Sequence, residues 1–211
     1  MIDRWIIRKL FRLFLYRYAP LMRDELLHLG KILEQMQFQQ TKNNLASCGK
    51  ALKLRKGVLI THPENVHLGN YVGINYNCCI MGQGGVHIGD YCVLGPGSKI
   101  ITVGHPIGGM YYSATYQEPV ILGKNVWLGA GAIVLPGVTI GDHVIIGAGA
   151  VVSKSIPAGK VALGIPARIR GDVPFNAEEY EYQVKMITEQ GQSLIVPRSD
   201  SDHMIPVDSI Q

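Results

Sequence analysis

The 211-residue chain is poor in charge, with only 17% Asp, Glu, Lys and Arg, and it lacks the cysteine patterns of metal sites. Neither a C-x-x-C pair nor a zinc-ligand spacing occurs among its cysteines, Cys48, Cys78, Cys79 and Cys92. We therefore expect free, reduced thiols and no metal. The apolar N-terminal stretch is interrupted by basic residues, Arg8, Lys9, Arg12 and Arg17. This argues against a signal peptide or a membrane-spanning helix and predicts a cytoplasmic protein.

Charge is unevenly distributed along the chain. Residues 1–56 hold 12 of the 20 Lys and Arg side chains against four acids, whereas residues 172–211 hold eight acids against Lys185 and Arg198. Such asymmetry is typical of nucleic-acid or membrane contacts. No basic and aromatic pattern of an RNA- or DNA-binding module accompanies it, so we expect no nucleic-acid partner.

The first segment, residues 1–53, is predicted to be a helical, basic and amphipathic extension. Apolar and basic side chains gather on opposite sides of a helix of 3.6 residues per turn, with Ile6, Leu10 and Phe14 against Arg8, Lys9 and Arg12. Pro20 is expected to break this helix, and a second helix is expected over residues 21–40. Residues 1–18 could bind peripherally to an anionic membrane, at its inner face. Alternatively, the apolar stripe packs on the domain or on a neighbouring subunit.

A six-residue repeat runs from about Leu54 to Pro157. Each unit starts with a large aliphatic residue: Leu68, Ile74, Ile80, Ile88, Leu94, Ile100, Leu122, Leu128, Val134, Ile140, Ile146 and Val152. Four positions after most of these starts lies a small or β-branched residue: Val72, Cys78, Cys92, Ser98, Val126, Ala132, Val138, Val144 and Ala150. The spacing is six except for a gap of eight after Ile80 and a gap of 22 after Ile100. A repeat of this length predicts a solenoid.

The period of six has a simple physical meaning. Strand side chains alternate in and out with period two, so an even repeat keeps the same positions inward on every pass. Six residues form one short face and one corner, and three such faces close a triangular coil. Successive coils then stack about 4.8 Å apart with parallel pairing. The repeat therefore predicts a mainly β fold, a parallel β-helix. General rules favour right-handed connections, and the spacing does not overturn them.

The regular units after the long gap carry a family resemblance. The runs Leu122 to Asp142 and Ile146 to Lys154, with the later Gly164-Ile-Pro-Ala-Arg, resemble the hexapeptide-repeat acyltransferases. Within that family, residues 58–171 are most similar to the maltose, galactoside and capsular-sugar O-acetyltransferases. The resemblance implies a left-handed β-helix, a homotrimer and acetyl-CoA as the acyl donor. It also implies a hydroxyl acceptor, which we expect to be a sugar of a surface polysaccharide or glycolipid precursor.

The gap between Ile100 and Leu122 predicts a loop over residues 101–121, because a solenoid can extrude a loop without disturbing its coils. The loop contains Gly104-His105-Pro106. By residue type alone, His105 could be a solvated loop histidine. The resemblance implies that it is the catalytic base, since the family places its base in a matching Gly-His-Pro. A neutral imidazole would take the proton from the sugar hydroxyl, whose oxygen attacks the thioester without an acyl-enzyme intermediate.

Asn75 matches an asparagine that the family uses near the acceptor, where its amide would bind a sugar hydroxyl or orient His105. Alternatively, Asn75 satisfies a corner in the left-handed conformation. Gln83 replaces a family carboxylate, and Gly73 replaces an aromatic residue of the galactoside enzymes. These departures argue against a simple galactoside or maltose acceptor. A larger glycan precursor could stack on loop tyrosines, Tyr111, Tyr112 and Tyr116.

A pantetheine arm needs a flat, extended groove, and the small side chains of Ala130 and Ala148 would leave the stacked coils open for it. Trp127 would wall this groove, or it would pack outward against a neighbouring subunit. Three further residues match family contacts to the nucleotide of acetyl-CoA, namely Ser153 and Lys154 at the phosphates and Arg168 at the adenine end.

The β-helix domain is expected to span residues 54–171, and a C-terminal segment follows over residues 172–211. Asn176 is predicted to cap a short helix over Ala177–Gln190, and acids in its first turns favour it. The remainder is polar and interrupted by proline.

Three alternative functions follow from the residues. An amino-sugar N-acetyltransferase would use the same base on an amine. Zinc carbonic anhydrases with this fold bind metal through three histidines, but the close pair of His62 and His67 precedes His87 and His105, the reverse of the order in that family. A non-enzymatic trimeric scaffold would not need His105.

Overall fold

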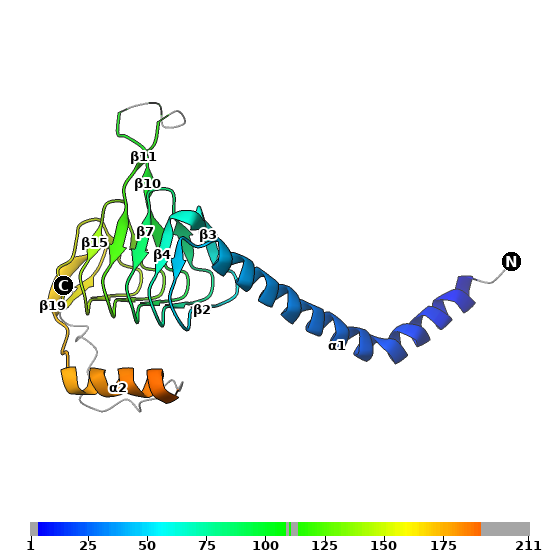
Figure 1. The fold of residues 1–211 in the computed structure, drawn as a ribbon. Coiled ribbons are helices and arrows are strands. Elements are labelled where there is room, and N and C mark those ends of the chain that lie inside the picture. Colours follow the sequence, from blue (N-terminus) through cyan, green and yellow to red (C-terminus); the bar gives the residue numbers. More distant parts are fainter. Residues whose placement is uncertain (1–3, 109, 111–113, 191–211) are drawn as a thin grey trace. The chain divides into compact units, whose positions relative to one another are not determined.

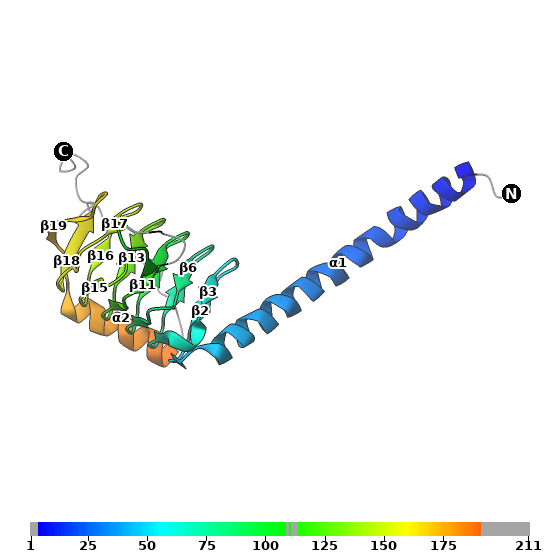
Figure 2. The ribbon, with the colours of Figure 1, turned by 90° about the horizontal axis from the view of Figure 1, so that it is seen from above.

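The computed structural model describes residues 4–108, 110 and 114–190. Its central feature is a solenoid of short strands in which the chain visits three sheets, here called A, B and C, in the same order on each coil (Figure 1). Seen from above, the strands of successive coils lie in parallel rows (Figure 2). The predicted parallel β-helix is therefore confirmed.

Every strand pair in the three sheets is parallel except β18 with β19. Sheet A consists of β1 (Ser47–Cys48), β4 (Val66–Leu68), β7 (Val86–Ile88), β12 (Val120–Leu122) and β15 (Thr139–Ile140). Sheet B consists of β2 (Lys53–Leu54), β5 (Gly73–Ile74), β8 (Val93–Leu94), β13 (Trp127–Leu128), β16 (Ile145–Ile146), β18 (Lys160–Leu163) and β19 (Arg168–Asp172). Sheet C consists of β3 (Leu59–Thr61), β6 (Cys79–Met81), β9 (Lys99–Ile101), β14 (Ile133–Val134) and β17 (Val151–Val152).

The interior of the prism follows the repeat. All twelve aliphatic starts are buried, and so are the smaller residues four positions later, Ser98 included. Leu128 and Ile146 lie in register on neighbouring strands and are fully buried. Burying one such side chain contributes about 1.5–3 kcal/mol, so the stacked aliphatic residues hold the coils together.

The solenoid begins at β1, earlier than the boundary at residue 54 that the repeat suggested. Ser47 and Cys48 of β1 pair with His67 and Leu68 of β4. Cys48 occupies the inward position that an aliphatic residue takes on later coils. Cys48, Leu54 and Ile60 keep the spacing of six, but a cysteine replaces the first aliphatic residue and the short 3-10 helix η1 (Pro63–Asn65) widens the next step to eight, which makes this coil harder to recognise.

A single helix, α1 (Arg4–Asn44), precedes the solenoid. The predicted break at Pro20 is wrong, because the helix continues through it. Proline removes one backbone hydrogen bond and crowds the preceding turn, which often bends a helix without ending it. Among the described residues, no helix has a stretch both long and apolar enough to cross a bilayer.

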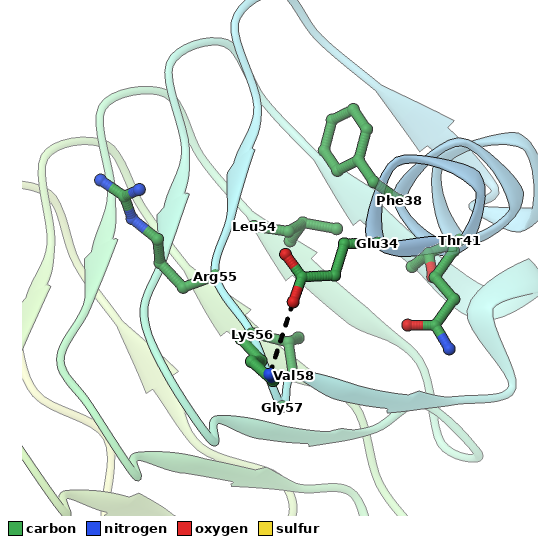
Figure 3. Close-up of a pocket in the computed structure, with 9 residues that line it drawn as sticks. Glu34, Phe38, Thr41, Leu54, Arg55, Lys56, Gly57 and Val58 are labelled. Carbon is green, nitrogen blue, oxygen red and sulfur yellow. Dashed lines mark ion pairs between the residues drawn. The ribbon is translucent and has the colours of Figure 1, made fainter. Parts of the chain in front are cut away.

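The last turns of α1 pack on the first coil of the solenoid. Glu34 forms a 3.4 Å ion pair with Lys56, and Phe38 packs against the core (Figure 3). A pocket of about 170 Å³ lies between this end of α1 and the turn around Gly57 (Figure 3). None of the predicted site residues lines it.

The C-terminal helix forms as the sequence predicted. It is α2 (Ala177–Gln190), and it belongs to a second unit that starts at Pro174. The side-chain Oδ1 of Asn176 accepts a 3.1 Å hydrogen bond from the Glu179 N–H, which confirms the cap.

Candidate active site

The predicted loop leaves the solenoid between β9 and β12, at the corner between sheets C and A. Its stem is a two-stranded antiparallel ladder of β10 (Val103–Gly104) and β11 (Tyr116–Gln117), which stands out from the coils (Figure 1). His105 follows β10 directly and is exposed. The ladder therefore fixes where the chain carrying His105 leaves the solenoid.

Thr102 anchors the base of this hairpin and is completely buried. Its hydroxyl donates a hydrogen bond to the Met81 carbonyl and accepts one from the Gly84 N–H at 2.9 Å. Its own carbonyl accepts a 2.9 Å bond from the Glu118 N–H. A Cβ on Gly84 would lie 2.7 Å from the Thr102 carbonyl oxygen, so only glycine lets the stem pass this corner.

Two features position the chain at His105. A Cβ on Gly104 would lie 2.5 Å from the ring of Tyr116, which therefore lies across the residue preceding His105. Nδ1 of His105 lies 3.0 Å from the carbonyl oxygen of Ala114, on the returning side of the loop. A carbonyl can only accept, so this hydrogen bond requires the proton on Nδ1 and places the ring lone pair on Nε2. The sequence had no signal for the role of Ala114, because a backbone carbonyl is common to all residues.

Gln83 lies at the same corner as the hairpin, next to Gly84. Its Oε1 accepts a 3.2 Å hydrogen bond from the Thr61 hydroxyl one coil earlier. Both residues are half-buried. The sequence carries no signal for Thr61, because the repeat does not show which side chains of successive coils contact each other.

Asn75 lies at a different corner, between sheets B and C. Its Nδ2 donates a 3.0 Å hydrogen bond to the Leu94 carbonyl of the next coil. The left-handed residue of this corner is Asn77, with φ of 57°, and not Asn75. The alternative that Asn75 serves the corner through a left-handed conformation is therefore wrong. Its side chain nevertheless ties two coils together, and the residue is half-buried.

The corner between sheets B and C carries an exposed residue at the equivalent position of each coil. These residues form a ladder joined by backbone hydrogen bonds, and the last two have the smallest side chains: Lys56, Tyr76, Pro96, Ala130 and Ala148. The backbone is accordingly most accessible at Ala130 and Ala148. Trp127 lies nearby on sheet B, 53% exposed, between Val93 and Ile145 of the adjacent coils.

The predicted nucleotide contacts gather at the last coils. Ser153 and Lys154 follow β17 and are exposed. The Ala167 N–H donates a 2.8 Å bond to the Val151 carbonyl, which brings Arg168 close to the end of β17. Arg168 is exposed, and its Nη1 also donates to the Ala167 carbonyl at 2.9 Å. Two cations thus lie at one end of the solenoid, where they could bind phosphates.

Two further groups of residues were predicted, the loop tyrosines and the histidines of the alternative zinc site. Tyr111 and Tyr112 lie outside the described residues. His67 and His87 lie in register on sheet A with parallel rings 4.5 Å apart, and His67 contacts the Ser47 hydroxyl. Within the described ranges, no group of three His, Cys, Asp or Glu side chains converges as a metal site would require.

Comparison with known proteins connects this geometry to a family. Residues 119–154 match the model for bacterial transferase hexapeptide (six repeats). The chain is 42% identical to nodulation protein L of Rhizobium meliloti (strain 1021), over 62% of this chain and 72% of that protein.

Two solved structures extend the comparison. A maltose O-acetyltransferase from Clostridium difficile 630 is 37% identical, with a TM-score of 0.62 over 64% of this chain and 73% of that one. A galactoside acetyltransferase in complex with coenzyme A is 30% identical, with a TM-score of 0.61 over 69% of this chain and 73% of that one. The chain therefore belongs to the hexapeptide-repeat acyltransferases. This confirms the left-handed β-helix and the enzyme class, an acetyl-CoA-dependent acyltransferase.

Proposed function

We propose that the protein transfers an acetyl group from acetyl-CoA to a hydroxyl of a sugar, within a surface polysaccharide or glycolipid precursor. The observation that carries the proposal is the 3.0 Å contact between His105 Nδ1 and the Ala114 carbonyl. It fixes the tautomer in which Nε2 can accept a proton. The maltose and galactoside enzymes among its relatives support a sugar hydroxyl as the acceptor.

In this mechanism, Nε2 of His105 removes the proton of the acceptor hydroxyl while that oxygen attacks the thioester carbonyl. The tetrahedral intermediate collapses, the C–S bond breaks, and the proton passes from the imidazolium to the departing CoA thiolate. General base catalysis supplies roughly 10²–10⁴-fold of the rate, and positioning of the two bound substrates supplies much of the rest. Gln83 and Asn75 would hold the acceptor through their amides.

The donor would lie along the corner between sheets B and C. The pantetheine arm would pass over Ala130 and Ala148, where the side chains are smallest. Trp127 would flank the arm on sheet B. Ser153, Lys154 and Arg168 would meet the nucleotide phosphates and the adenine end, since cations are the usual partners of phosphate groups.

The positions of Asn75 and His105 favour a site formed between two copies of the chain. Asn75 lies before β6 of sheet C, whereas His105 lies after β9 of the same sheet. The two residues therefore lie at opposite ends of these parallel strands. A three-residue strand already spans about 10 Å. Both residues can act on one acceptor if the B–C corner of one copy faces the hairpin of another. We propose the homotrimer that the family resemblance implies, with a site between each pair of copies.

The decisive test compares His105→Ala with His87→Ala, a variant of an exposed histidine on sheet A. Acetyl transfer is measured as CoA release against a panel of sugars, amino sugars, nucleotide sugars and lipid-linked glycans. His105→Ala should lose about 10²–10⁴-fold in rate, with acetyl-CoA binding and oligomer mass unchanged. His87→Ala should match the wild type. An unchanged rate for His105→Ala would remove the base assignment, and transfer only to amines would replace the O-acetyltransferase with an N-acetyltransferase.

A further inference from the structure

The middle of α1 carries an exposed apolar row whose spacing suits a coiled-coil seam. Five exposed residues follow one another at intervals of four, three, four and three: Met22, Leu26, Leu29, Leu33 and Met36. Each is at least half exposed. We call this row the α1 seam. An average spacing of 3.5 residues is that of helices that wind around one another, and it places Leu26 and Leu33 at a positions and the others at d positions.

The seam is not the face with which α1 contacts its own solenoid. That contact uses Glu34, Phe38 and Thr41, which line the pocket at the first coil (Figure 3). At 100° per residue, the centre of the seam lies roughly 130° around the helix from this contact face. Packing against the solenoid therefore leaves the seam exposed for a second partner.

Charge separates the seam region from the N-terminal end of the same helix. Residues 22–44 hold Arg23, Lys31 and Lys42 against Asp24, Glu25 and Glu34, a balance of zero. Residues 1–18 hold five Arg and Lys against Asp3, a balance of plus four. Identical copies can lie side by side without repulsion along the neutral part, whereas the basic part would repel itself. An anionic membrane would attract the basic part electrostatically, but it would not attract the neutral part in this way.

We propose that the α1 seam forms a parallel, in-register coiled coil with the α1 helices of the other copies of this chain. The inference rests on the homotrimer proposed above, because a closed ring of three copies directs all three helices the same way. Ile32, 38% exposed, occupies the flanking g position and widens the apolar contact face. The coiled coil would order a helix that is marginal by itself in water, and would present three basic ends together.

Cysteine cross-linking of the full chain tests the arrangement in a Cys48→Ser/Cys79→Ser background. Met22→Cys and Met36→Cys place a thiol near each end of the seam, so that both form same-residue disulfides only if the helices are parallel and in register. Mild oxidation should convert up to two of every three chains to covalent dimers in each variant. The matched control Asp24→Cys, on the opposite side of the helix, should stay monomeric on a non-reducing gel.

A second pair of substitutions tests whether cross-linking depends on the seam or on any exposed apolar residue of α1. Leu27 and Leu29 are 56% and 50% exposed, but only Leu29 belongs to the seam. In the Met22→Cys variant, Leu29→Asp should lower the cross-linking yield at least fivefold, and Leu27→Asp should leave it unchanged. Equal losses would overturn the proposal.

Mass measurement separates this proposal from the one on which it rests. A trimeric mass without cross-links in Met22→Cys and Met36→Cys overturns the coiled coil and leaves the proposed site intact. A monomeric mass overturns both. A third outcome also overturns it: vesicles of anionic phospholipid abolish the cross-links and bind the chain only while Leu29 is intact, because the membrane would then cover the seam.

Discussion

The hydroxyl of Thr102 accepts a 2.9 Å hydrogen bond from the backbone N–H of Gly84, and so ties the base of the β10–β11 hairpin to the corner that carries Gln83. The same hydroxyl donates to the Met81 carbonyl. One buried side chain thus connects three segments on two coils.

Replacing Thr102 with valine should therefore affect both stability and catalysis. The isosteric change leaves the Gly84 N–H and the Met81 carbonyl without their partner, which costs about 1–3 kcal/mol. Acetyl transfer should fall because the hairpin stem is less well fixed. Thermal unfolding and CoA release check these effects. Thr139→Val, an exposed substitution on sheet A, should change neither.

Gly104→Ala should impair transfer while the solenoid stays folded. The added methyl group would lie 2.5 Å from the Tyr116 ring, so the ring or the chain at His105 must move. Loss of activity with unchanged acetyl-CoA binding is the expected result. The double variant Gly104→Ala/Tyr116→Ala should recover part of the activity, because it removes the clash. Gly171→Ala is the matched control, since a Cβ there would meet nothing within 4 Å. Wild-type activity in Gly104→Ala would contradict the proposed geometry.

Ala148→Leu should weaken donor binding more than it affects folding. Ala148 is an exposed corner residue, so a larger side chain has room in the isolated chain but would obstruct an arm passing over the backbone. We expect KM for acetyl-CoA to rise about tenfold, equivalent to about 1.4 kcal/mol. Ala158→Leu places the same side chain on an exposed residue at another corner. Equal effects of the two variants on KM would exclude the predicted donor groove.

Cys92 should make the fold sensitive to alkaline pH. Burial raises the pKa of its thiol from 9.0 to about 12, although the hydrogen bond from the Val126 N–H opposes the shift. Because the folded pKa lies above the unfolded one, the stabilisation is complete below pH 9 and is lost as pH rises towards 12. Urea unfolding between pH 8 and pH 11 should show a steeper decline in the wild type than in Cys92→Ala, by up to ~1.4 kcal/mol per pH unit. Parallel declines would mean that another group dominates.

The parts of the fold that depend on local pattern were predictable. The aliphatic positions from Leu68 to Val152 are buried as the period requires, and Asn176 caps α2 through a side chain adjacent in sequence. The predicted helix break at Pro20 was wrong because a proline costs a helix only one backbone hydrogen bond. The flanking turns of a long helix can outweigh that loss. The first coil was missed because Cys48 stands where the pattern expected an aliphatic residue.

The amino-acid sequence by itself determined the solenoid, its loop and the family, because all three depend on residue type at fixed spacing. Only the tertiary structure decided which residues meet across coils. Thr61 bonds to Gln83, Thr102 to Gly84, and His105 to the Ala114 carbonyl. It also placed Asn75 before the strands of sheet C and His105 after them, at opposite ends of those strands. The physical reason is that these contacts form where one coil stacks on the next. Insertions such as η1 and the hairpin shift which residues of successive coils lie in register, and the six-residue repeat does not predict that shift.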